Sequence, residues 1–342
     1  MKLLKFIFAI SLSIVCLSAE KNIVTSKGNI LVTGGNGYIG LSTCRALKEN
    51  GYTPVSVDNS SNSAIPTTTW GPIEKGNILK KKWLHKVFKK YKFIGIIHLA
   101  AKIYVPESVD QPLLYYRENV DGLLNILEFA IEFDIKGIVF ASTSAVYGNL
   151  ESEDPVSESH PTQPLSPYAE TKMIGETLLK FAWERHKIPS AILRYFNVCG
   201  IDKATDNKDG HSVHLIPSLF KAFQKTPVEV KIFGTDYSTS DGTCIRDYVH
   251  VNDVAQANVK ALEYILTQKE PITANIGSGN SYSVIQVAQA VSRYAKLNYT
   301  EIRLPRRPGD IPVVVADITK AKEIFKWEPA NSELENIVKS YY

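Results

Sequence analysis

Short apolar runs alternate along the first part of the chain with longer segments whose apolar positions recur at helical spacing. The short runs predict buried strands, and the longer segments predict amphipathic helices between them. The predicted strands are residues 29–35, 53–59, 93–101, 137–143 and 190–197, and the predicted helices include 38–51, 119–134 and 166–181. Because strands joined by crossover helices form parallel sheets, we expect an α/β fold of the Rossmann type, with a doubly wound parallel sheet.

Beyond Cys199 the pattern becomes less regular. A polar, turn-rich stretch at residues 200–212 is followed by shorter apolar elements with further turns between them. We therefore expect a smaller C-terminal α/β domain that closes over the crevice of the first. The expected division is a leader at 1–22, a Rossmann domain at 28–197 and a substrate domain at 198–342, with a segment near 245–265 packing back on the Rossmann domain.

A glycine-rich turn joins the first predicted strand to the first predicted helix. The spacing of Gly34, Gly37 and Gly40 allows a tight turn and brings backbone N–H groups to the helix N-terminus, where a pyrophosphate binds. The second predicted strand ends at Asp58, the place where a dinucleotide-binding fold holds the adenosine ribose. An acid there favours NAD over NADP, so the sequence predicts an NAD site.

Tyr168 and Lys172 lie on the same face of the helix predicted at 166–181. A fixed positive charge favours a phenolate, so Lys172 is expected to lower the pKa of Tyr168 and make it an acid/base catalyst. Thr143 and Asn197 lie at the carboxyl ends of two predicted strands, where active groups of such sheets gather. The Tyr–Lys spacing also occurs by chance on helix surfaces, so alone it does not establish catalysis.

Composition and charge exclude other classes of function. The 342 residues are 44% apolar and 22% charged, and the net charge of +4 gives no reason to expect nucleic-acid binding. The lysines of segment 79–93 flank a single apolar helical stripe and are expected to form a solvated face. The four cysteines lack the spacing of a metal site or a disulfide framework, so we predict no metal.

The N-terminus has the form of a secretory signal. A short basic start precedes an apolar run from Phe6 to Leu17, which is short for a membrane span, and small residues follow at Ser18 and Ala19. The alternative is an unused translational extension. Localisation therefore stays open between a secretory route and the cytoplasm. The supply of substrate and cofactor favours the cytoplasm. Contact with a membrane is expected only if the leader is retained.

A set of motifs from Asn29 to the C-terminus carries a family resemblance. The motifs are VTGGNGYIG, VDNSSNS, IIHLAA, VPESVDQPLLYYRENV, SPYAETK, LRYFNVCG, HLIP, IFGTDYSTSDGTCIRDYVHV and PRRPGD. Together they resemble the extended short-chain dehydrogenases/reductases, and within them the UDP-glucose 4-epimerases, also called UDP-galactose 4-epimerases. The resemblance implies an NAD-dependent isomerase of galactose metabolism that interconverts UDP-galactose and UDP-glucose by transient oxidation at sugar C4. It also implies a possible homodimer.

The resemblance assigns roles to individual positions. It implies that Thr143, Tyr168 and Lys172 are catalytic. The implied cofactor-binding residues are Gly34, Gly37, Tyr38, Ile39, Gly40, Asp58, Asn59, Asn62, Asn77, Ile78, Leu99, Ala100, Ala101, Asn119, Tyr168, Lys172 and Tyr195. The implied substrate-binding residues are Thr143, Asn197, His214, Leu215, Phe233, Arg246, Arg307 and Asp310. Phe233 would pack on uracil, Arg246 and Arg307 would bind the pyrophosphate, and Asp310 would bind the uridine ribose.

Three positions depart from the pattern of many members of this family. Asn77 stands where many members carry an aspartate, and Ile103 stands where some members carry a lysine near the nicotinamide ribose. Val314 stands where sugar-restrictive members carry a bulky tyrosine, so we expect some tolerance for N-acetylated hexosamines.

Several alternatives remain open from the sequence. They are a 4-epimerase of UDP-glucuronate, of a UDP-pentose or of a UDP-N-acetylhexosamine, and a non-catalytic NAD-binding protein. A 4,6-dehydratase is disfavoured, because Ser144 and Ala145 stand where dehydratases carry an acid pair.

Overall fold

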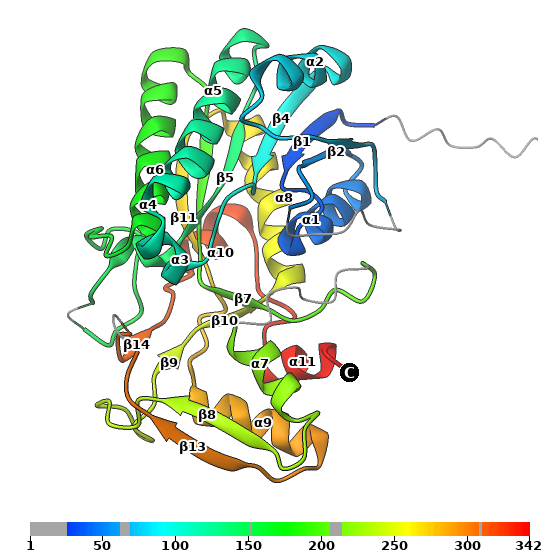
Figure 1. The fold of residues 1–342 in the computed structure, drawn as a ribbon. Helices are drawn as coiled ribbons and strands as arrows, with labels where there is room; N and C mark the ends of the chain where they lie inside the picture. The colour runs from blue at the N-terminus through cyan, green and yellow to red at the C-terminus, as the bar shows by residue number, and fades with distance from the viewer. Residues whose placement is uncertain (1–25, 62–68, 151, 206–213, 308–309) are drawn as a thin grey trace, which may run out of the picture.

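The structure is a computed structural model that describes residues 26–61, 69–150, 152–205, 214–307 and 310–342. The leader predicted at 1–22 and the predicted cofactor residue Asn62 lie outside the described residues. Figure 1 shows two lobes, an α/β lobe around a large sheet and a smaller lobe that contains the C-terminus.

Seven parallel strands form the large sheet, in the order β11-β6-β5-β4-β1-β2-β3. The strands are β1 (Asn29–Thr33), β2 (Thr53–Asp58), β3 (Ile73–Lys75), β4 (Phe93–His98), β5 (Ile138–Thr143), β6 (Ser190–Tyr195) and β11 (Ile272–Ile276). The chain runs outward from β1 to β3 and then crosses back to β4. Because the strand order reverses between β1 and β4, their carboxyl ends open a crevice.

Helices cover both faces of this sheet. One face carries α1 (Tyr38–Glu49), α8 (Val251–Gln268) and α10 (Thr319–Phe325), and the other carries α2 (Lys81–Tyr91), α5 (Gly122–Glu132) and α6 (Pro167–His186). The alternation of side chains along a strand explains why β1 serves both layers. Ile30 and Val32 pack with α1 and α8, whereas Leu31 packs with α2 and α5.

The smaller lobe has its own apolar core, formed around the parallel pair β8 (Glu229–Phe233) and β13 (Thr300–Leu304). Its helices are α7 (Leu215–Ala222), α9 (Val284–Ala295) and α11 (Leu334–Ser340). The other short strands form two small sheets: β7 (Asn197–Cys199) pairs with β10 (Tyr248–His250), and β9 (Ile245–Arg246) pairs with β12 (Tyr282–Ser283) and β14 (Val313–Val314).

The predicted fold class is confirmed, and two strands add to it. β3 was not expected, and β11 lies in the less regular part of the chain beyond Cys199, where no strand of the large sheet was predicted. Neither strand carries a long apolar run, because each lies at an edge of the sheet and pairs on one side only. Since α8, β11 and α10 belong to the large lobe, the chain returns there after β7; the domain boundaries stay a prediction.

The remaining short helices follow β4 and β5. They are α3 (Val105–Asp110), α4 (Pro112–Tyr115), a π-helix (Tyr116–Asp121) that runs into α5, and a 3-10 helix (Ser144–Tyr147). Across the described ranges, none of the helices combines the length and apolar character needed to cross a membrane.

Candidate active site

A cavity of about 1620 Å³ lies between the two lobes, where the β1–β4 crevice faces the smaller lobe. Its wall contains every described residue that the sequence assigns to the cofactor except Asn119, and all eight assigned to the substrate. The structure therefore brings together positions that lie far apart in the chain. The cofactor positions cluster at the large lobe, and Phe233, Arg307 and Asp310 mark the opposite end.

The glycine turn is as tight as its spacing predicts. Gly34 has a φ of +69°, and a Cβ added there would lie 2.9 Å from the backbone nitrogen of Ala100. A Cβ on Gly40 would lie 2.1 Å from the carbonyl oxygen of Gly34. Only glycine permits so close an approach of α1 to the end of β1, which leaves the N-terminus of α1 open to a pyrophosphate.

The polar groups beside this turn fit a dinucleotide. The Asp58 carboxylate accepts hydrogen bonds from the backbone N–H groups of Asn36 at 3.1 Å and Ser60 at 2.7 Å. The Asn36 side-chain oxygen accepts from Ser56 at 2.7 Å, while its Nδ2 is buried without a hydrogen-bond partner in the described part of the chain. A buried donor of this kind at the cavity wall is satisfied by a polar ligand. The residues present therefore fit an NAD molecule.

Local sequence signals place the candidate catalytic side chains. Ser166 caps α6 by accepting a hydrogen bond from the N–H of Ala169 at 3.2 Å, and Pro167 occupies the first helical position. Tyr168 consequently lies in the first turn of α6 and points into the cavity, with Lys172 one turn further along. Thr143 ends β5 on the same wall, and its hydroxyl hydrogen-bonds the Tyr168 phenol.

The electrostatics of this group differ from the prediction. Burial raises the pKa of Tyr168 to about 12, and the hydrogen bond with Thr143 offsets only part of that rise. Lys172 is not among the causes of this shift; its ammonium donates to the Ala141 carbonyl at 2.8 Å and lies 5.1 Å from the Phe140 ring centroid. Burial also lowers the pKa of Lys172 to about 8. The prediction that Lys172 lowers the pKa of Tyr168 is therefore wrong when only the groups of the protein are considered.

The opposite end of the cavity pairs aromatic and cationic groups. The Arg307 guanidinium lies 4.0 Å from the Phe233 ring centroid, and Arg246 lies 3.7 Å from the Asp310 carboxylate. His214 precedes α7, and its carbonyl accepts from the N–H of Ser218 at 3.0 Å. An aromatic face beside two guanidinium groups suits a nucleobase attached to phosphates.

A family model describes most of the chain. Residues 30–277 match the NAD dependent epimerase/dehydratase family.

The chain belongs to this family.

Relatives and solved structures agree with that membership. A UDP-glucose 4-epimerase of Rhizobium meliloti is 41% identical over 305 residues, which are 89% of this chain and 93% of the relative. The crystal structure of the Brucella ovis UDP-glucose 4-epimerase in complex with NAD has a TM-score of 0.87 and 35% identity, covering 92% of this chain and 97% of that one. A UDP-Glc/GlcNAc 4-epimerase of Campylobacter jejuni has a TM-score of 0.80 and 32% identity, with coverage of 92% and 98%. The family, fold class, enzyme class and NAD dependence predicted from the sequence are confirmed.

Two predicted cofactor residues of this epimerase-family chain use their polar atoms elsewhere. Asn119, in the π-helix, donates to the Lys102 carbonyl and to Thr171, both at 3.0 Å, and accepts from the Lys102 N–H at 2.7 Å. It lies behind the cavity wall and holds the loop after β4 in place. The Tyr195 hydroxyl donates to Asn258 on α8 at 2.5 Å. Tyr195 therefore lines the cavity with atoms other than this hydroxyl hydrogen.

The three positions that depart from the family pattern have different surroundings. The Asn77 side-chain oxygen accepts from the N–H of Leu79 at 2.8 Å and shapes the turn before α2. Ile103 is 41% exposed and lines the cavity. Val314 is outside the lining and packs with an apolar cluster that includes Val146 and Phe196. The room for bulkier sugars expected at Val314 therefore stays a hypothesis.

Some residues of the site were missed by sequence reasoning. Asn36 lies inside the glycine motif and could have been found there. Asp247 gives no local signal: its buried carboxylate accepts from the backbone N–H groups of Ser278, Gly279 and Ala316 and so braces the strands beside Arg246. Within the described ranges, no three His, Cys, Asp or Glu side chains are placed to hold a metal ion.

Proposed function

We propose that this protein interconverts UDP-galactose and UDP-glucose, with NAD as a tightly held cofactor. The observation that carries the proposal is the cavity itself. The hydrogen-bonded Thr143–Tyr168 pair lies between a glycine turn that fits a dinucleotide and an aromatic, cationic end that fits a uridine diphosphate.

The acid/base step is assigned to Tyr168. As a phenolate it accepts the proton of the sugar 4-hydroxyl, and the Thr143 hydroxyl hydrogen-bonds the same oxygen and orients it. NAD, held by the glycine turn and the groups around Asp58, would supply the hydride acceptor and donor for C4, and its positive charge would favour the Tyr168 phenolate. Lys172, anchored on the Ala141 carbonyl, supports the cofactor side of the cavity.

The substrate is held mainly by its nucleotide. Phe233 and Arg307 at the far end, with Arg246 and Asp310, would bind uridine and pyrophosphate, leaving the hexose with fewer contacts. Loose retention of the hexose lets the 4-keto sugar present either face, while the binding energy of the nucleotide keeps it in the cavity.

The direct test uses the purified protein with UDP-galactose and no added cofactor. Formation of UDP-glucose up to a fixed equilibrium ratio, together with NAD released on denaturation, supports the proposal. Absence of conversion even with added NAD contradicts it and favours the non-catalytic alternative, provided that UDP-glucuronate and UDP-pentoses also give no product.

A broader substrate range is the second candidate. It is favoured by the similarity to the Campylobacter jejuni protein, which is named a UDP-Glc/GlcNAc 4-epimerase. Val314, from which the sequence suggested this range, lies outside the cavity lining and adds no structural support. UDP-N-acetylglucosamine is the test substrate. No detectable product beside robust turnover of UDP-galactose would refute the broader range.

We also propose that two copies of the chain associate through helices α3 to α6. These helices lie together on one side of the large lobe (Figure 1). They carry apolar side chains that are well exposed. Leu113 is 79% exposed, Val109 62% and Phe181 58%. Several exposed apolar side chains on one layer of helices mark a surface suited to a partner.

A further inference from the structure

The segment that leaves the large lobe after β7 is held by a group of polar contacts outside the cavity. Asn197 in β7 lines the cavity, and the chain then turns through residues 200–205. His214 and Leu215, which follow in sequence, line the cavity again at the substrate side. The described segment 200–205 therefore follows directly on the substrate wall formed by Asn197, Val198 and Cys199.

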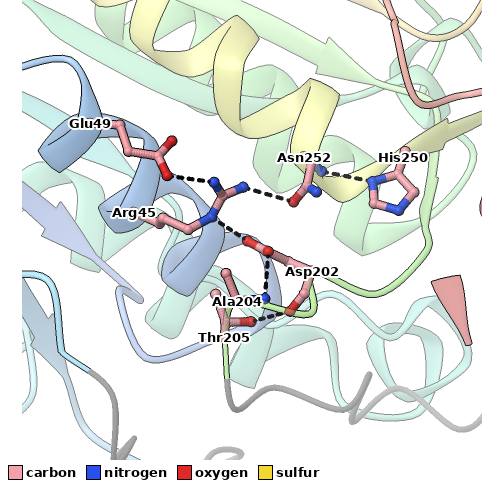
Figure 2. Close-up of polar contacts among 7 residues, drawn as sticks. All are labelled: Arg45, Glu49, Asp202, Ala204, Thr205, His250 and Asn252. Carbon is pink, nitrogen blue, oxygen red and sulfur yellow. Dashed lines mark hydrogen bonds and ion pairs between the residues drawn. The ribbon is translucent and has the colours of Figure 1, made fainter.

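Arg45 of α1 is the centre of this group (Figure 2). Its Nε donates to the Asp202 carboxylate at 2.8 Å, and the two side chains are 15% and 4% exposed. Its other nitrogens donate to Glu49 at 2.8 Å and to Asn252 at 3.2 Å. One guanidinium thus joins α1 to the segment after β7 and to the start of α8.

Asp202 in turn fixes the local fold of its segment. Its second carboxylate oxygen accepts from the N–H of Ala204 at 3.2 Å, and its carbonyl accepts from the Thr205 hydroxyl at 3.0 Å (Figure 2). Gly200, two residues earlier, has a φ of +86°, and a Cβ there would lie 2.2 Å from the buried ring of His250. The segment therefore has little freedom to shift without losing these contacts.

The same helix also forms the cofactor end of the cavity. Tyr38, in the first turn of α1 beside the glycine turn, donates its hydroxyl hydrogen to the Gly200 carbonyl at 2.5 Å. On the other side, Tyr341 and Ser340 accept from the N–H groups of Gly200 and Ile201 at 3.2 and 2.8 Å. Helix α1 thus contacts the segment through two of its residues. Tyr38 lies next to the glycine turn, and Arg45 lies about two helical turns further along α1.

We propose that the Arg45–Asp202 ion pair is a positioning device that couples the two ends of the cavity. It holds the substrate-side segment 200–205 against the helix whose N-terminus forms the cofactor turn, so each ligand strengthens binding of the other. Because such coupling is reciprocal, loss of the pair weakens both UDP binding and NAD retention. The inference rests on the proposed function, since it assumes the nucleotide and cofactor ends assigned above.

The test compares Asp202→Asn with the matched control Glu49→Gln. The control removes the other acidic partner of the same guanidinium, Glu49, whose side chain is 47% exposed, and leaves the Arg45–Asp202 contact intact. UDP is titrated calorimetrically into each purified holoenzyme, and NAD released on denaturation is measured per chain. We expect Asp202→Asn to weaken UDP binding about ten-fold and to retain less NAD, with kcat changed far less than KM, and Glu49→Gln to match the wild type.

A purely structural ion pair gives a different result. A lower melting temperature for Asp202→Asn with UDP affinity and NAD content within about two-fold of the wild type overturns the inference. The double variant Arg45→Met/Asp202→Leu leaves no unpaired buried charge and keeps the test valid if the single variant does not fold. Weak UDP binding by a stable double variant supports the coupling, and wild-type binding overturns it. A wild-type protein that binds no UDP refutes the proposed function itself.

Discussion

Tyr168 shows how much of a catalytic group depends on its surroundings. Burial raises the pKa of its phenol to about 12 even though the Thr143 hydrogen bond opposes the rise, so a nearby positive charge such as that of NAD⁺ would favour the phenolate. Replacing Tyr168 by Phe removes the acid/base group while leaving the nucleotide contacts of the far wall intact. We expect turnover of UDP-galactose to fall by about 10²- to 10⁴-fold with UDP affinity preserved.

The matched control for this experiment is Tyr116→Phe. Tyr116 is also partly buried, and it interacts with Glu170 rather than with the cavity. The control should turn over UDP-galactose at the wild-type rate. Turnover by Tyr168→Phe within ten-fold of wild type, measured by separating the nucleotide sugars, would show that another group transfers the proton.

His98, at the end of β4, makes a second prediction at this scale. It is 1% exposed, hydrogen-bonds Thr33 at 2.8 Å, and its pKa is lowered by burial to about 3. Between about pH 6.5 and pH 3, the imidazole of the folded protein stays neutral, whereas that of the unfolded chain, with a pKa near 6.5, takes up a proton. This contribution to stability is therefore complete above pH 6.5 and is lost progressively as the pH falls toward 3.

Urea unfolding of the wild type and His98→Asn at several pH values tests this assignment. Between pH 7 and 4.5 the free energy of unfolding of the wild type should fall by about 2 kcal/mol more than that of the variant. His186→Asn, at the exposed end of α6, should show the wild-type slope. Parallel curves for wild type and His98→Asn would refute the assignment.

At the scale of elements, α6 is fastened to the sheet by a buried ion pair. Glu176, one turn beyond Lys172, accepts two hydrogen bonds from Arg194 of β6, at 3.0 and 2.6 Å, and one from Ser142 of β5 at 2.5 Å. The paired side chains are only 7% and 8% exposed. Since breaking such a pair leaves a buried charge unpaired, Glu176→Gln should lower the free energy of unfolding by about 3 kcal/mol.

The same helix offers a matched control. Lys180 and Glu184 form an exposed pair, with side chains 72% and 52% exposed. Glu184→Gln should cost less than about 0.5 kcal/mol in the same urea-unfolding measurement. Equal losses for the two variants would mean that burial does not set the strength of the Glu176 contact.

At the scale of the whole molecule, the apolar surface of α3 to α6 predicts self-association. Phe181→Asp places a charge on this surface and should convert a dimer to a monomer in sedimentation experiments. Leu297→Asp, on the smaller lobe at a side chain 46% exposed, should leave the mass unchanged. A wild-type protein that sediments as a single chain at micromolar concentration would contradict the proposed dimer.

Short-range patterns in the sequence determined much of this protein. The β1–α1 glycine turn, Asp58 at the end of β2 and the capped start of α6 at Ser166 each depend on residues close together in the chain. Glycine conformation, capping and side-chain periodicity act over a few residues, so they can be predicted without the fold. The doubly wound topology follows because successive strands and helices have few ways to connect.

Only the tertiary structure decided the features that depend on burial and on distant contacts. The Tyr168 pKa is raised because the fold encloses the phenol and leads Lys172 to the Ala141 carbonyl. β11 is a strand because β6 is there to pair with it. The Arg45–Asp202 pair joins residues more than a hundred positions apart. Burial and long-range pairing arise only when the chain has folded, so they cannot be predicted from a local pattern of residues.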